Sequence, residues 1–269
     1  MQFSHKTLPD GRNFLYAWFS AMFTRIDLII IKKVSEDELV GVAQRIEAEV
    51  LRIEAFANKF NPETELSYIN RLAGKQEVHV SEEMLQILAE CEIYNQKTLG
   101  YFDITAGSET PFLKEKYFLN REKSKVRFAH ANVKLDLSGF IKGYALRKVS
   151  EILKNENIPD ALVNIGNSSV FAKGNHPFGE GWKIQVPDTK AECVLHDECL
   201  TTSGNHPDTK WPVLIPGSGI PGTNASVASV ITRDGAEGEA LSTAVYLAKE
   251  NEVSLMLENF NARWLLALS

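Results

Sequence analysis

Residues 35–60 constrain the fold more than any other segment of this sequence. Their apolar side chains recur every three or four residues from Val42 to Phe56, which predicts a long helix with one buried face. Ser35 followed by Glu38 fits a capping box and marks the start of the helix. Because such a helix is stable mainly through its apolar face, the rest of the chain must supply a surface for it to cover.

The remaining segments supply both helices and strands. Residues 81–100, 140–158, 238–250 and 252–260 have helical patterns, and a short helix is expected within 61–74. Strand-like runs stand between them, within the first 33 residues and at residues 77–80, 125–130, 134–139, 161–174, 182–186, 225–232 and 263–269. There is no repeat or linker, and 269 residues with 44% hydrophobic content are enough for one core. We therefore expect an α+β fold, a single compact domain with a mixed or antiparallel sheet and flanking helices.

The apolar run at residues 14–23 has the outline of a signal peptide. No cleavage site of small residues follows it; charged residues and a second apolar run at 28–31 come next, so two strands are the better interpretation. The run is also too short to cross a bilayer. We expect no membrane span and a cytoplasmic protein, exported only if a leader preceded this sequence.

Charge and cysteine usage exclude two further classes. A net charge of −6 gives no general attraction to nucleic acid. Three cysteines do not form a disulfide framework and suit a reducing compartment. Cys193, His196 and Cys199 match no standard zinc spacing, which favours ordinary loop residues.

One small-residue turn could hold a phosphate. Ser138 and Gly139 end a strand-like run just before the helix predicted from residue 140, and Lys142 adds a positive charge in its first turn. Backbone N–H groups at such a helix start can approach an anion. The alternative is an ordinary turn, because glycine is common wherever a strand passes into a helix.

The segment GYFDITAG, residues 100–107, brackets two aromatic residues and a carboxylate between glycines. Tyr101 or Phe102 could stack on a heteroaromatic ring, and Asp103 could accept a hydrogen bond from a ribose or an amine. The alternative is that the aromatic residues belong to the core and Asp103 caps a turn.

Glu239 and Thr243 are four residues apart in a predicted helix, so they share one face. A carboxylate and a hydroxyl there offer two oxygen ligands to a hard cation such as Mg²⁺. The alternative is a solvated helix start, in which Glu239 interacts with the helix dipole and Thr243 bonds to the preceding turn.

Taken in chain order, seven segments from about residue 20 onward resemble those of the FAD:protein FMN transferase (ApbE-like) family. LDLSGFIKGYAL is similar to the family's L-D-L-G-G-I-A-K-G-Y-A, and ALVNIGNS to its A-L-V-N-I-G-G-D. The other five are AMFT, FNPETELSYIN, GYFDITAG, TTSGN and GEALSTAVYLA. Collinear matches of this number indicate an ApbE-like, T-fold-related architecture over residues 20–269, with residues 1–19 as an N-terminal extension.

The resemblance also implies a function. Such proteins bind FAD, cleave its pyrophosphate with Mg²⁺ and transfer FMN to a Thr or Ser of an acceptor protein. The resemblance implies Ile141, through its carbonyl, with Glu239 and Thr243 as metal ligands. It implies a FAD site formed by Met22, Phe60, Tyr101, Phe102, Asp103, Ser138, Lys142, Tyr144 and Val213.

The chain departs from the family pattern at several of these places. Phe23 replaces a glycine, and Glu239 replaces an aspartate. In PVLIPGSG, Pro212 and Ile215 stand where the family segment H-I-I-D-P-x-T-G has His and Asp. His206 is a candidate replacement for the lost base, with an ordinary loop histidine as the alternative. Loss of the base leaves two other functions open: a non-catalytic FAD-binding protein, or a Mg²⁺-dependent FAD pyrophosphatase with water as acceptor.

Overall fold

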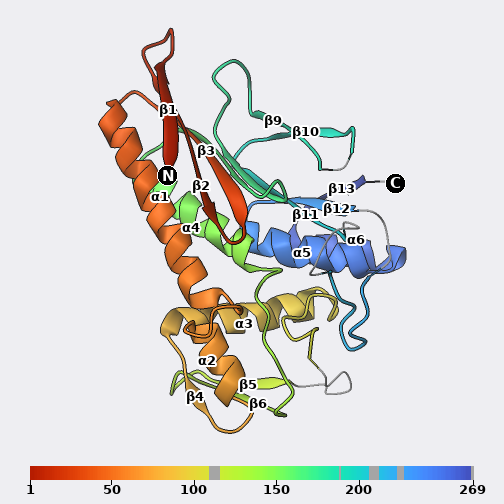
Figure 1. Cartoon of the computed structure of the whole chain (residues 1–269). Coiled ribbons are helices and arrows are strands. Elements are labelled where there is room, and N and C mark those ends of the chain that lie inside the picture. Colours follow the sequence, from red (N-terminus) through yellow and green to blue (C-terminus); the bar gives the residue numbers. More distant parts are fainter. Residues whose placement is uncertain (109–115, 188, 206–211, 223–226, 268–269) are drawn as a thin grey trace.

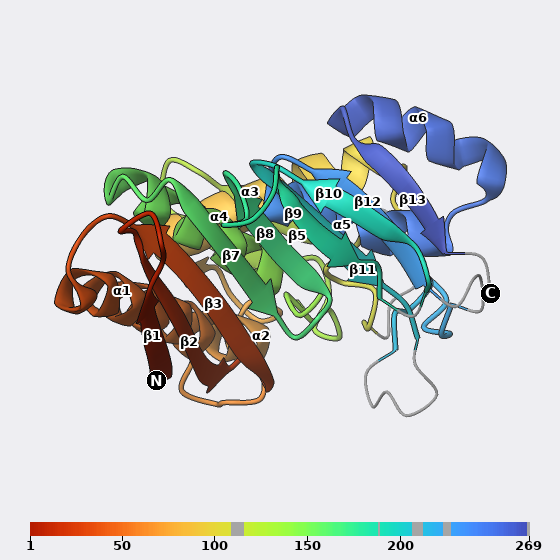
Figure 2. The ribbon, with the colours of Figure 1, turned by 90° about the horizontal axis from the view of Figure 1, so that it is seen from above.

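A computed structural model describes residues 1–108, 116–187, 189–205, 212–222 and 227–267. Eight strands form the main sheet, and every neighbouring pair in it is antiparallel (Figures 1 and 2). Their order across the sheet is β1 (Gln2–Thr7), β2 (Asn13–Ala21), β3 (Thr24–Lys32), β7 (Asp160–Ile165), β8 (Ser169–Lys173), β11 (Glu198–Ser203), β12 (Val227–Thr232) and β13 (Arg263–Ala267). Strands from both ends of the chain therefore share one antiparallel sheet. This confirms the predicted α+β fold, a single domain built on one such sheet.

The helices cover one face of this sheet. Seen from above in Figure 2, α1 (Glu36–Ala57), α4 (Ile141–Asn155) and α5 (Gly235–Leu247) lie side by side beneath the strands. The helices α2 (Glu65–Leu72) and α3 (Glu82–Lys97) lie below α5 in Figure 1, whereas α6 (Glu250–Phe260) lies beside β13 at the edge of the sheet in Figure 2. The predicted capping box is present in α1, since Ser35 and Glu38 exchange side-chain and backbone hydrogen bonds.

The other face is covered in part by the hairpin of β9 (Trp182–Gln185) and β10 (Glu192–Leu195). Trp182 and Leu195 of this hairpin pack on Ile31, Val170 and Leu200 of the sheet and form a second apolar cluster. A small sheet of β4 (Val78–His79), β6 (Lys125–Phe128) and β5 (Tyr117–Asn120) lies beyond α3. None of the helices in the described part of the chain has the length and apolar character needed to cross a bilayer.

The apolar run at residues 14–23 forms most of β2 and the turn into β3, as the two-strand interpretation predicted. Residues 1–19, for which the resemblance implied an extension, contribute β1 and most of β2 to the sheet. The strand expected at residues 134–139 is wrong. That segment is irregular because Leu135 pairs through its backbone with the side chain of Asn70 rather than with a strand.

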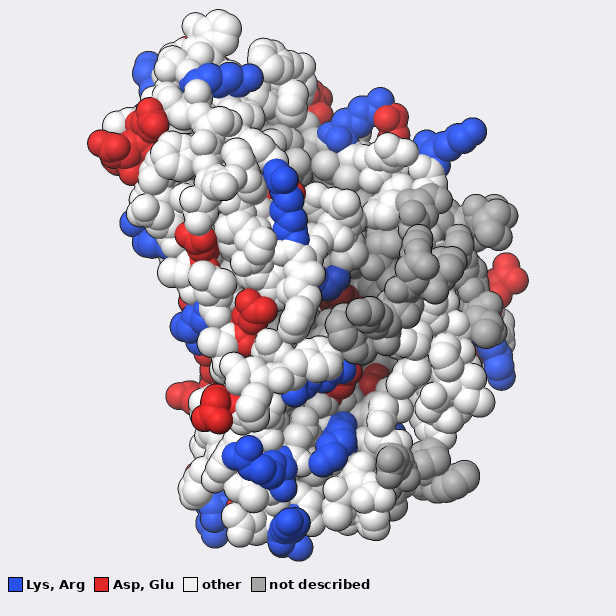
Figure 3. All heavy atoms as spheres, viewed as in Figure 1, with Lys and Arg blue, Asp and Glu red and all other residues white. Residues whose placement is uncertain are grey.

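Acidic and basic side chains are interspersed on the face seen in Figure 3. Lys and Arg predominate only at the lower end, over α2 and the small sheet. The net charge of −6 is therefore not concentrated on this face.

Candidate functional site

Two adjoining cavities meet at the start of α4. An aromatic cavity of about 300 Å³ is lined by Met22, Phe23, Phe60 and Ile141, among others. A polar cavity of about 320 Å³ is lined by Glu239, Thr243, Ser168 and Ser203, among others. Asp136, Ser138 and Lys142 line both cavities, so one ligand could extend from the first into the second.

The aromatic cavity is bounded by the tight turn between β2 and β3. Met22 and Phe23 are its two central residues and have φ angles of 53° and 59°. Two left-handed residues suit a two-residue hairpin turn, but glycine or asparagine is the usual choice, so Phe23 adopts a conformation that costs a non-glycine residue about 1 kcal/mol. The Phe23 ring meets the Phe60 ring edge to face, with centroids 5.6 Å apart. The cavity therefore has one wall of two aromatic rings.

The segment 135–138, where the cavities join, is held from three sides. Asn70 accepts from the Leu135 N–H at 2.7 Å and donates to the Leu135 carbonyl at 2.9 Å. The carboxylate of Asp136 accepts from the Ser138 N–H at 2.9 Å and from the Ser138 hydroxyl. It also forms an ion pair with Lys59. This network fixes the turn from which α4 begins.

Glu239 provides a buried carboxylate beside the polar cavity. Only 4% of Glu239 is exposed, and burial raises the pKa of its carboxyl above the ordinary value, while the charge of Lys142 and a hydrogen bond from Ser169 act in the opposite direction. One turn further along α5, the Thr243 hydroxyl lies 3.2 Å from Ser203 Oγ at the end of β11. The carboxylate and this hydroxyl therefore line one cavity from one helix face, as the spacing predicted.

A close crossing of α4 and α5 places Glu239. A Cβ atom added at Gly143 would lie 2.0 Å from the Gly235 carbonyl oxygen and 2.6 Å from Glu239 Cγ. Only glycine leaves room for this approach, so Gly143 determines how near the Glu239 side chain lies to the start of α4.

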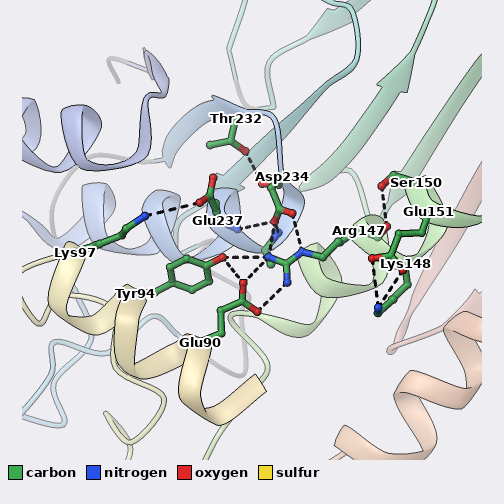
Figure 4. A network of polar contacts seen from close by, with 11 residues as sticks. Glu90, Tyr94, Lys97, Arg147, Lys148, Ser150, Glu151, Thr232, Asp234 and Glu237 are labelled. Atoms are coloured by element: carbon green, nitrogen blue, oxygen red, sulfur yellow. Dashed lines mark hydrogen bonds and ion pairs between the residues drawn. The ribbon is translucent and has the colours of Figure 1, made fainter. Parts of the chain in front are cut away.

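A polar network anchors the start of α5 (Figure 4). Arg147 of α4 donates to Asp234 at 2.6 and 2.8 Å and to Glu90 of α3 at 2.7 and 2.8 Å. Asp234 is the N-cap of α5 and accepts from the N–H groups of Ala236 and Glu237. Arg147 thus ties three helices together one turn before Glu239.

The residues of GYFDITAG that were predicted to contact FAD differ in their burial and in their hydrogen-bond partners. Tyr101 lines the polar cavity and donates to Glu252 of α6 at 2.7 Å. Phe102 also lines this cavity, although it is 3% exposed and packs on Phe140, as the core alternative expected. Asp103 accepts from the Thr105 N–H and hydroxyl and pairs with Lys116 at 2.8 Å, so its carboxylate already has three donors.

Tyr144 lies on the far side of α4. Its hydroxyl donates to Glu83 of α3 at 2.8 Å, and its ring stacks on Phe140. Val213 and Pro212 line the polar cavity, whereas Ile215 is exposed. The Val213 N–H donates to Asn205, the last residue of TTSGN, at 2.6 Å. His206 lies outside the described residues.

Four site residues are not among those predicted from the sequence: Asp136, Lys59, Ser169 and Ser203. Asp136 forms an Asp-x-Ser turn with the predicted Ser138, and this spacing is a local signal in the sequence. Lys59, Ser169 and Ser203 reach the site only through the packing of distant segments, and no local pattern indicates them.

This arrangement suits a ligand with a flat ring at one end and an anionic chain at the other. In the part of the chain that the structure describes, no three His, Cys, Asp or Glu residues converge on one point. A cation here would have one protein carboxylate, that of Glu239, with the hydroxyls of Thr243 and Ser203 in the same cavity. Mg²⁺ accepts such a set when phosphates or water complete its coordination. A buried carboxylate with a single described hydrogen-bond donor fits a cation that offsets its charge.

The family model and the related proteins that match this sequence all belong to one family. The sequence model of the ApbE family matches residues 22–265. A FAD:protein FMN transferase of Chlamydia pneumoniae is 27% identical over 210 residues, which are 69% of this chain and 66% of that protein, just under two thirds of its length. One of Klebsiella pneumoniae is 22% identical over 258 residues, which are 81% of this chain and 78% of that protein.

Solved structures agree on the fold. The ApbE protein of Thermotoga maritima superposes with a TM-score of 0.79 at 20% identity and covers 93% of both chains. The flavin transferase ApbE of Vibrio cholerae gives a TM-score of 0.76 at 17% identity, over 93% of this chain and 92% of that one.

Proposed function

Because the chain belongs to the ApbE family, we propose that it is a FAD:protein FMN transferase. It would cleave the pyrophosphate of FAD, release AMP and join FMN to a Thr or Ser hydroxyl of an acceptor protein. The names of its relatives support this assignment. Within the molecule, the proposal depends on one observation: an aromatic cavity and a polar cavity share Asp136, Ser138 and Lys142.

The two cavities match the two parts of FAD that the reaction must hold. The isoalloxazine ring would lie against Phe23 and Phe60, whose rings form one wall. The pyrophosphate would lie at the start of α4, where the Lys142 ammonium offsets negative charge and Ser138 offers a donor. FAD would thus be fixed at both ends of the bond to be broken, which lowers the barrier by positioning.

The magnesium site would consist of Glu239, Thr243 and the Ile141 carbonyl. When bound, Mg²⁺ offsets charge on the phosphate oxygens of the leaving AMP. The protein residues keep the two helices in register for it: Gly143 allows the close approach of α4 to α5, and Ser203 orients the Thr243 hydroxyl. Glutamate in place of the family's aspartate reaches one methylene further, and the absence of a side chain at Gly143 leaves room for Glu239 Cγ.

The acceptor side favours a second candidate function. Pro212 lines the polar cavity at the place of the family histidine, and proline carries no side-chain base. Water could then replace the acceptor hydroxyl, which would make the protein a FAD pyrophosphatase.

A titration of FAD into the protein with and without Mg²⁺, followed by chromatography of the nucleotides, tests the proposal. Binding with AMP formed only in the presence of Mg²⁺ is the expected result. Free FMN in equal amount to AMP would identify the pyrophosphatase. Binding without any product would leave a FAD-binding protein or a transferase that cleaves FAD only when its acceptor protein is present. Absence of binding would overturn the flavin assignment altogether.

A further inference from the structure

Ser168 presents a hydroxyl inside the polar cavity on a rigid support. It ends the three-residue turn between β7 and β8, in which Gly166 and Asn167 have φ angles of 62° and 60°. Asn164 and Asn167 bond to each other across this turn, at 2.9 and 3.0 Å. The Thr202 N–H donates to the Ser168 carbonyl at 2.8 Å. The position of the hydroxyl is therefore fixed by the sheet itself.

The hydrogen bonds around Ser168 determine how its hydroxyl points. Lys142 Nζ donates to Ser168 Oγ, and Ser169 donates to Glu239 Oε1. Since a hydroxyl has one proton, Ser169 has none left for Ser168, so Ser168 is the donor across the 3.4 Å that separates the two oxygens. One lone pair of Ser168 Oγ accepts from Lys142, and the other is available to an electrophile in the cavity.

Ser168 also stands where the phosphate would lie. It lines the same cavity as Lys142, Glu239 and Thr243. It lines, too, a second and larger hollow of about 670 Å³ that opens between β9 and the β7–β8 turn. The similar family segment A-L-V-N-I-G-G-D ends in a carboxylate at this place, so the hydroxyl is a departure of this chain.

We propose that Ser168 is itself an FMN acceptor: it takes FMN from FAD to form a phosphoester within the chain's own site. This inference rests on the proposed cleavage of FAD. Ser168 Oγ forms a bond to the phosphorus of the FMN half, and the bond from that phosphorus to the bridging oxygen breaks. The bridging oxygen leaves with AMP, and the serine proton ends on the AMP phosphate. No oxidant or reductant is needed, and Lys142 holds the attacking oxygen in position.

Intact-protein mass spectrometry of the full chain incubated with FAD and Mg²⁺, without an acceptor protein, tests the inference. The expected result is one FMN phosphoester per chain, located by peptide mapping to Ser168, with one equivalent of AMP. Ser168→Ala should lose the adduct, Ser168→Thr should keep it, and Ser150→Ala on the far part of α4 should behave as wild type. Melting temperatures and FAD titrations confirm that each variant folds and binds.

The outcomes separate the two proposals. If AMP forms by turnover but wild type has no adduct and Ser168→Ala is equally fast, the inference is wrong and FAD cleavage stands. An adduct mapped to another residue also refutes it. If FAD binds but neither AMP nor an adduct forms, the inference is wrong, because Ser168 then does not act as an acceptor, while transfer to a separate acceptor protein stands. If FAD does not bind, the proposed function fails and the inference fails with it.

Discussion

Replacing Gly143 by alanine adds only one methyl group, but it should lower both the stability of the fold and the rate of FAD cleavage. The new Cβ would lie 2.0 Å from the Gly235 carbonyl oxygen, and real Cβ atoms are not found within 3.0 Å of another heavy atom. The two helices must therefore separate by about 1.0 Å, the difference between these distances. Overpacking of this kind costs about 1–3 kcal/mol in unfolding free energy.

The same displacement acts on Glu239, whose Cγ would lie 2.6 Å from the new methyl group. A misplacement of 1 Å in a catalytic arrangement can lower the rate by about 100-fold. We expect Gly143→Ala to lower the rate of AMP release from FAD by about that factor, measured at saturating Mg²⁺ by chromatography, with unfolding followed in urea.

Gly41→Ala in α1 is the matched control. Gly41 is also helical, and its new Cβ would meet only the end of the Arg45 side chain, at 3.6 Å. Alanine should therefore stabilise α1 by up to about 1 kcal/mol and leave the rate unchanged. If Gly143→Ala is as stable as Gly41→Ala and retains activity within about twofold, the account of the helix crossing is wrong.

Three further predictions concern stability. Arg147→Met should lower the free energy of unfolding in urea by roughly 2 kcal/mol, because Glu90 and Asp234 lose their shared partner. Arg121→Met, at an exposed ion pair, should lower it by under about 1 kcal/mol. Equal effects would contradict the role given to Arg147. Gly166→Ala should lower the free energy of unfolding more than Gly219→Ala. Both glycines have left-handed φ angles, but only at Gly166 would a Cβ lie 2.6 Å from Thr24 Oγ1. Equal losses in the two variants would show that Thr24 moves aside freely. Hydrogen bonds from Arg52 hold the pKa of Glu83 below its usual 4.5. This carboxylate therefore stabilises the fold above that pH, and its contribution is lost as the pH falls through the pKa of the folded state. In Glu83→Gln the free energy of unfolding should fall less steeply toward acid pH than in wild type, and an unchanged slope would contradict this.

The parts of the fold that follow from local patterns were predictable from the sequence. The capping box and periodicity located α1, and the four-residue spacing placed Glu239 and Thr243 on one helix face. Family resemblance, confirmed by the match over residues 22–265, indicated how distant segments assemble into one site.

The predictions that were wrong concern residues whose positions depend on contacts between distant segments. Residues 134–139 alternate like a strand, but the backbone of Leu135 finds its partner in the side chain of Asn70. Tyr144 follows Lys142 by two positions, and the helical turn directs its side chain to Glu83 rather than toward the cavities. The contact of Ser169 with Glu239 joins residues 70 positions apart, which no local pattern reveals.

The central claim is that FAD is cleaved at a magnesium site built on Glu239. The most direct test measures AMP release from FAD by wild type and Glu239→Gln over a Mg²⁺ series, with EDTA as the zero point. We predict AMP formation that saturates with Mg²⁺ in wild type and is abolished in Glu239→Gln, which keeps the side-chain shape and its capacity to accept from Ser169. AMP formation that persists in EDTA, or that is equal in the variant, would contradict the account.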